Sequence, residues 1–289
     1  MALDGLEEMT HQLARTSRIA RPAVLLGPAQ GHLGTFRELL SGTVAVGHRR
    51  RAYALTGEAS LLVGRLAQLL NRWPESHMHL SWATSLADEA GDDTLRAHAF
   101  GAMSALHSGI PRGGRGGDPT KAIQILDAAI DMTSSSTSPY LVAWLYARRA
   151  EERATATDST GAWRDLETAG RALAAAVNPD NGFFRHLDSA WLAGYRGNCA
   201  RLLREPSEAI ASLEHGLRVK TISSERAGHR SGVLADLAAA YALPGQSQDV
   251  QQACALLVEA LCAWPCESTR LWPTKVPTHM PGPDVVGEE

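Results

Sequence analysis

The sequence has 289 residues, a net charge of −3, 44% hydrophobic residues and 20% charged residues. This balance is ordinary for a soluble globular chain, and it provides no global basic field for direct nucleic-acid binding. No run of about eighteen apolar residues is present, which excludes a membrane-spanning helix. Acidic residues at 4, 7 and 8 argue against a signal peptide, and the four cysteines lack CxxC spacing. We therefore expect a cytoplasmic protein with free thiols.

The helical content is expected to be high throughout the chain. Alanine and leucine dominate the apolar residues, and alternating β-branched runs are nearly absent. Both features predict an all-α fold. Residues 1–20 show a helical period, and a second helix is expected through Phe36 and Leu40.

Five helical hairpins are expected to follow, over residues 50–90, 92–132, 138–176, 184–219 and 223–263. In each hairpin a small residue in the first helix is followed in the second by small, large and small residues, at steps of four and three. In the fourth hairpin these are Gly197, Ala209, Leu213 and Gly216. Such spacing is typical of tetratricopeptide hairpins. It predicts a tetratricopeptide-like solenoid of about five hairpins in a right-handed superhelix, although a long α-bundle could give a similar period.

Three regions are expected along the chain. Residues 1–48 form an N-terminal linker with its helices, residues 49–264 form the helical repeat domain, and residues 265–289 form a tail. Five prolines and an acidic end predict that this tail is disordered.

Several segments resemble one known family. They are LLVGRLAQLL, SLADEAGD, AWLYARRAEERA and CARLLREPSEAIASLEHGL. Together they resemble the tetratricopeptide sensor region at the C-terminus of actinobacterial helix-turn-helix transcriptional regulators of the XRE type. The resemblance covers residues 1–263, and residues 3–13 resemble the linker after the DNA-binding domain. No helix-turn-helix pattern precedes that linker in this sequence, so DNA binding is not carried over from the family. The resemblance implies a regulatory ligand sensor, and three interpretations stay open: a start placed too late, a degraded relative of the family, or a free-standing sensor module without its own DNA-binding domain.

The resemblance also implies that the first helix of each hairpin lines a concave groove. Residues six and three before the small residue, and one and four after it, share the inward side of such a helix. These offsets select nine candidate ligand-binding residues: Glu58, Arg65, Gln68, Arg96, Trp144, Glu151, Trp191, Asn198 and Arg201. Aromatic walls beside charged groups suit a peptide, a small molecule or a protein segment. The alternative is that both tryptophans simply pack between repeats.

The sequence predicts no catalytic residue, metal site or cofactor. The glycine-rich stretch 113–121 lacks the phosphate-loop spacing, and none of the eleven histidines forms an HExxH motif. We therefore expect a non-enzymatic module for ligand binding or protein–protein interaction, with a regulatory role. The alternative is a helical enzyme or accessory protein of a biosynthetic pathway that uses the groove as its site. A homodimer is a further expectation, because solenoid ends expose apolar surface unless they are capped.

Overall fold

The computed structural model describes residues 2–17, 20–42, 45–110, 117–177, 183–184, 187–219, 227–243 and 247–263. This described part contains twelve α-helices, one short 3₁₀ helix and no strand, which confirms the all-α prediction. The helices are α1 (Ala2–Thr16), α2 (Pro22–Ser41), α3 (Val46–Leu69), α4 (Trp73–Ala90), α5 (Asp93–Ser104), α6 (Pro119–Asp131), α7 (Pro139–Thr155), α8 (Ser159–Ala174), α9 (Ser189–Leu202), α10 (Pro206–Val219), α11 (Ala227–Ala242) and α12 (Ser247–Ala263). Among the described helices, none is long and apolar enough to cross a membrane.

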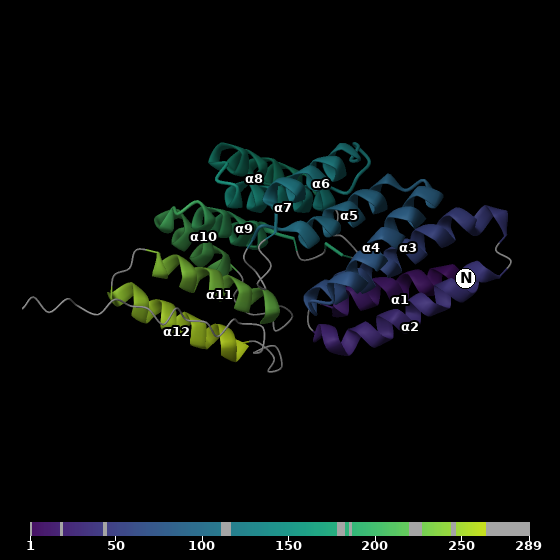
Figure 1. The fold of residues 1–289 in the computed structure, drawn as a ribbon, viewed down its shortest axis with the longest axis horizontal. Helices are drawn as coiled ribbons and strands as arrows, with labels where there is room; N and C mark the ends of the chain where they lie inside the picture. Colours follow the sequence, from purple (N-terminus) through teal and green to yellow (C-terminus); the bar gives the residue numbers. More distant parts are fainter. Residues whose placement is uncertain are drawn as a thin grey trace, which may run out of the picture.

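The helices pack as successive hairpins. The five expected hairpins correspond to α3–α4, α5–α6, α7–α8, α9–α10 and α11–α12, and α1 and α2 precede them. The first helices of the hairpins also contact one another in succession, from α3 through α5, α7 and α9 to α11. We call these five the A helices. In Figure 1 the hairpins follow an arc, with α1–α2 and α11–α12 at its two ends and α5 to α8 at its crest.

The small residues predicted in the A helices allow close approach within the hairpins. A Cβ atom on Gly64 would lie 2.9 Å from the Leu80 side chain of α4. A Cβ atom on Gly197 would collide with Leu213 and would lie 3.1 Å from the backbone oxygen of Ala209, both in α10. In these two hairpins the helices therefore meet at the positions that the small–large–small pattern selected.

Polar caps set the boundaries of several helices. The Asp92 side chain accepts a hydrogen bond from the backbone of Leu95 at 2.9 Å, and α5 begins there. Asp118 and Asp158 cap α6 and α8 in the same manner. Gly91 ends α4 in the left-handed conformation, with φ of 65°, which glycine adopts without strain.

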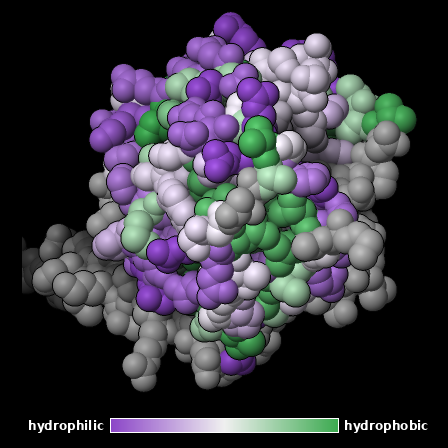
Figure 2. All heavy atoms as spheres, turned by 90° about the vertical axis from the view of Figure 1, so that its right-hand side faces the viewer, coloured by the Kyte–Doolittle hydropathy of each residue, from purple (hydrophilic) through white to green (hydrophobic). Residues whose placement is uncertain are grey.

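The N-terminal helices share a core with the first hairpin. Phe36 of α2 is fully buried in a cluster with Leu62 and Leu66 of α3. Thr10 of α1 and His32 of α2 hydrogen-bond at 2.8 Å. Figure 2 looks onto this end of the array, where apolar side chains lie among charged ones. The expected tail, residues 265–289, lies outside the described residues.

Candidate functional site

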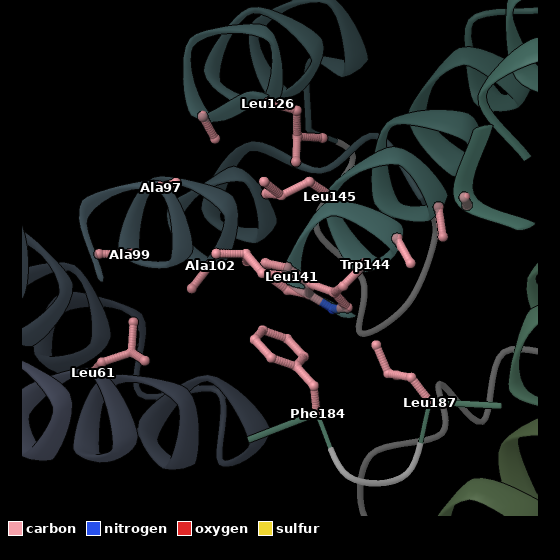
Figure 3. Packing of buried hydrophobic residues seen from close by; sticks show 14 of the residues in the cluster. Leu61, Ala97, Ala99, Ala102, Leu126, Leu141, Trp144, Leu145, Phe184 and Leu187 are labelled. Atoms are coloured by element: carbon pink, nitrogen blue, oxygen red, sulfur yellow. The ribbon is translucent and has the colours of Figure 1, made fainter. Parts of the chain in front are cut away.

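Three successive A helices bring aromatic and basic side chains together. Arg65 of α3, His98 of α5 and Trp144 of α7 meet Phe183 and Phe184 of the α8–α9 connection, and we call these five residues the aromatic–arginine cluster. The His98 ring centroid lies 5.4 Å from that of Trp144 and 4.6 Å from that of Phe184. In Figure 3 the Phe184 ring lies next to Trp144, on the side opposite Leu126 of α6.

The cluster holds one neutral imidazole beside one guanidinium group. Arg65 Nη1 lies 3.4 Å from Nε2 of His98. Burial lowers the pKa of His98 well below its usual value, and the neighbouring Arg65 lowers it further. Burial also lowers the pKa of Arg65, but a guanidinium remains protonated at physiological pH. His98 is therefore neutral and can accept a hydrogen bond from Arg65.

A chain of polar side chains continues along the next A helices. Glu151 of α7 accepts hydrogen bonds from Arg148 at 2.5 Å and from Asn198 of α9 at 2.6 Å. The Asn198 oxygen accepts a hydrogen bond from Arg201 at 2.6 Å. Arg201 in turn lies 3.6 Å from a carboxylate oxygen of Asp236 in α11. This polar chain links three hairpins through groups that are buried or partly buried.

A second buried carboxylate lies beside the polar chain. Glu152 of α7 accepts hydrogen bonds from the Ser108 hydroxyl at 2.6 Å and from the Gly109 backbone at 3.0 Å. Burial raises the pKa of Glu152, although Arg148 opposes this shift. Its contacts attach the connection after α5 to α7, so we assign Glu152 a structural role.

Five of the nine candidate residues lie in these two groups. Arg65 and Trp144 belong to the aromatic–arginine cluster, and Glu151, Asn198 and Arg201 belong to the polar chain. A sixth candidate residue, Gln68, donates a hydrogen bond to the backbone oxygen of Ala102 at 2.8 Å and so joins α3 to α5.

The two candidate tryptophans have different surroundings. Trp144 packs against His98 and Phe184, whereas the ring of Trp191 lies 4.6 Å from that of Tyr195 on the same helix. Trp144 is 8% exposed and Trp191 is 3% exposed. This burial agrees with the alternative in which the tryptophans pack between repeats. A ligand contact for either residue stays a prediction.

The remaining two candidates lie away from both groups. Glu58 of α3 lies 3.8 Å from Nε2 of His11, because α1 packs against this part of α3. Arg96 forms ion pairs with Asp88 and Asp93, each at 2.9 Å, across the α4–α5 turn. Arg96 therefore points toward the start of α5, the helix to which it belongs.

The offsets from the small residue that selected the nine candidate residues did not select His98, which lies one position away from a selected offset. Offsets counted from Ala102 select Arg96, whereas the same offsets counted from Gly101 select His98. A Cβ atom on Gly101 would lie 2.5 Å from the Trp144 side chain of α7, so Gly101 marks the contact between neighbouring A helices. Gly101 and Ala102 are both small, so the sequence alone does not tell which of them faces the neighbouring A helix. The contact with Trp144 of α7 shows that Gly101 does.

Sequence reasoning also missed Phe183 and Phe184. Phe184 is 5% exposed, and both residues belong to the connection between α8 and α9. The helical period carries no information about a connection. The segment before them consists of Asn, Pro, Asp and Gly, a composition that favours a surface loop. Two adjacent aromatic residues directly after such a segment were the signal that could have indicated burial against the helices.

Other kinds of site have little support within the described residues. That part of the chain contains no cluster of His, Cys, Asp and Glu side chains that could hold a metal ion. A hollow of about 450 Å³ lies outside the two groups, where the start of α3 meets the α4–α5 turn. Its lining mixes Arg50 and Arg51 with Asp92 and Asp93, so it presents no single charge to a ligand.

The comparisons with known proteins bear on the fold alone. No protein-family model matches the chain, and no curated protein matches it. Among solved structures, the chain is similar to BtubC (BKLC) from P. vanneervenii, with a TM-score of 0.55 and 17% identity. The match covers 89% of this chain and 99% of BtubC. At this identity the similarity shows a shared all-α architecture over most of both chains.

Proposed function

We propose that the chain is a non-enzymatic binding module of the tetratricopeptide type, which binds a peptide, a small molecule or a protein segment on the side lined by its A helices. The main support is the convergence of Arg65, His98 and Trp144 from three successive hairpins. Aromatic walls with one charged group fit a ligand that has both an apolar and a polar part.

The described residues favour binding over catalysis. His98 contacts Arg65 and three aromatic rings, and no described carboxylate orients it as a general base would require. Both oxygens of Glu151 accept hydrogen bonds from neighbouring side chains. A helical enzyme that uses this face would need an acid–base pair, and neither group supplies one.

The regulatory role that we propose draws on the resemblance to the sensor region of XRE-type regulators. In this role the chain works in the cytoplasm as a ligand sensor, and contacts with DNA are made by another domain or partner. The apolar residues exposed on the N-terminal helices, such as Met9 at 51% and Val24 at 64%, leave room for a homodimer contact at that end.

The binding proposal is tested by thermal-shift screening of the full chain against peptides, common metabolites and fractions of a cell extract. A ligand at a hundred times its Kd stabilises the fold by about 2.7 kcal/mol, which is measurable. Each hit is repeated with Trp144→Phe, which keeps an aromatic ring but removes the indole. The matched control is Trp163→Phe, because Trp163 of α8 also lies under a guanidinium group, that of Arg196, at 5.2 Å.

The proposal predicts saturable hits that weaken in Trp144→Phe and persist in Trp163→Phe. A screen without any saturable hit would contradict it. Hits that both variants bind as the parent chain does would also contradict it, because the ligand would then occupy another part of the surface.

A further inference from the structure

Arg65 differs from the other partly buried arginines of the A helices. The arginines of α7 and α9 that point into the array each lie 3.6 Å or less from a carboxylate oxygen; they are Arg148, Arg149, Arg153 and Arg201. Arg65 has no carboxylate partner among the described residues. Its contacts there include Nε2 of His98 and the faces of Trp144 and Phe183, at 5.7 and 6.0 Å from the guanidinium carbon, and Tyr195 of α9 is a further electrostatic neighbour.

An unpaired charge in such surroundings is costly. Removing a charged group from water is unfavourable unless an opposite charge or several hydrogen bonds replace the solvent. His98 is neutral, and the nearby Arg148 is already balanced by Glu151. Among the described residues, the surroundings of Arg65 therefore carry one uncompensated positive charge. A ligand that brings a negative charge to Arg65 would offset this cost.

We propose that Arg65 binds the carboxylate of an aromatic ligand, whose ring packs against the aromatic–arginine cluster. This proposal rests on the binding function above and names the ligand class for that face. A guanidinium group matches a carboxylate through two parallel hydrogen bonds. Trp144 and Phe183 offer ring faces beside it.

The charge balance selects a monoanion. One unpaired guanidinium neutralises one carboxylate, whereas inorganic phosphate near neutral pH carries between one and two negative charges and has no apolar part. Aromatic rings prefer offset or edge-to-face contacts with other rings, which the cluster already contains between His98 and Trp144. A ligand with a ring and a single carboxylate uses both features of the site.

The test measures binding of phenylacetate and indole-3-acetate to the full chain by calorimetry and thermal shift. Phenylacetamide, which lacks the charge, and inorganic phosphate, which lacks the ring, are measured in parallel. The key variant is Arg65→Met, because methionine retains an unbranched apolar side chain that packs well on aromatic rings. Arg96→Met is the matched control, since Arg96 is paired with carboxylates away from the cluster.

We expect saturable binding of at least one carboxylate, weakened tenfold or more in Arg65→Met and unchanged in Arg96→Met. Phenylacetamide and phosphate should bind at least tenfold more weakly than that carboxylate. The ligand-free Arg65→Met variant should melt at a higher temperature than the parent chain, because the uncompensated charge is gone. A purely structural role for Arg65 predicts the opposite shift.

The proposal is overturned if neither carboxylate binds, or if Arg65→Met binds them within twofold of the parent chain. Binding of phosphate in preference to the carboxylates would overturn the ligand class. If the carboxylates fail while the extract screen still yields a ligand that depends on Trp144, the binding function stands and only this inference falls.

A last arm asks whether the chain supplies its own carboxylate. Asp180 is the acidic residue nearest in sequence to Phe183. A double-mutant cycle combines Asp180→Asn with Arg65→Met and measures both melting temperatures. Additive shifts support a site that is free for a ligand. A loss in Asp180→Asn that disappears in the Arg65→Met background would show an internal ion pair and would overturn the proposal.

Discussion

The histidine in the aromatic–arginine cluster makes the stability of the fold depend on pH in a predictable direction. His98 is 5% exposed, and its pKa lies well below the usual value of 6.5 because burial and Arg65 both disfavour the imidazolium. As the pH falls, the unfolded chain therefore binds a proton that the folded chain does not bind. The stability that His98 contributes is fully present above pH 6.5 and is lost as the pH falls below it.

The size of the loss follows from proton linkage. If the unfolded histidine titrates near 6.5 and the folded one stays neutral, the free energy of unfolding is about 1.4 kcal/mol lower at pH 5.5 than at pH 7.5. Other histidines with lowered pKa values, such as His32 and His79, add to the total. Comparison with His98→Phe isolates the cluster, because this variant keeps a ring at position 98 and removes its titration.

Urea unfolding at pH 7.5 and at pH 5.5, followed by circular dichroism, measures the effect. We expect the parent chain to lose about 1.4 kcal/mol more than His98→Phe between the two pH values. The comparison uses only the change with pH, so a difference in packing between the variants cancels. Equal losses within about 0.3 kcal/mol would show that His98 titrates as freely in the fold as in the unfolded chain, and would refute the reasoning.

Three further predictions concern the packing that positions the site. Gly197→Val should destabilise the α9–α10 hairpin by about 1–3 kcal/mol or more in chemical denaturation, whereas Gly232→Ala, where a Cβ meets nothing within 4 Å, should be neutral or stabilising. Glu151→Leu should cost about 3–5 kcal/mol, because it leaves buried partners such as Asn198 unsatisfied; a loss under about 1 kcal/mol would contradict a structural polar chain. Asp188→Ala removes the cap that accepts the Trp191 backbone hydrogen at 2.8 Å and should cost about 1 kcal/mol by thermal unfolding, while Asp188→Asn should recover most of it.

The hairpins were predictable because the signal for them is local. Gly64 and Gly197 occur at fixed distances from the large residues that they meet, and this spacing is visible in the sequence. The same periodicity identified Glu151 and Asn198 as residues on one side of successive A helices. Their mutual hydrogen bond at 2.6 Å then follows from the stacking of α7 against α9.

The candidate site was less predictable because it depends on contacts between segments far apart in sequence. Glu58 has the expected position on α3, but its neighbour is α1, whose docking no repeat pattern describes. To identify His98, one has to know which residue of α5 faces α7, and the adjacent Gly101 and Ala102 are both small enough for that position. Phe184 comes from a connection, where no periodicity applies. A pattern within one hairpin thus locates a face, whereas the partners on that face depend on the whole array.

The position of the cluster has a consequence for how a binding event could act on the fold. Arg65, His98 and Trp144 belong to three successive hairpins, so the distances among them depend on how those hairpins are tilted relative to one another. A ligand shifts a conformational equilibrium only by its difference in affinity for the two states. A ligand that touches a single helix has the same affinity for both states.

A ligand that contacts all three residues binds best at one curvature of the array. The polar chain from α7 to α11 connects that region to the C-terminal hairpins. The same geometry that would make this face selective would therefore also couple its occupancy to the shape of the module.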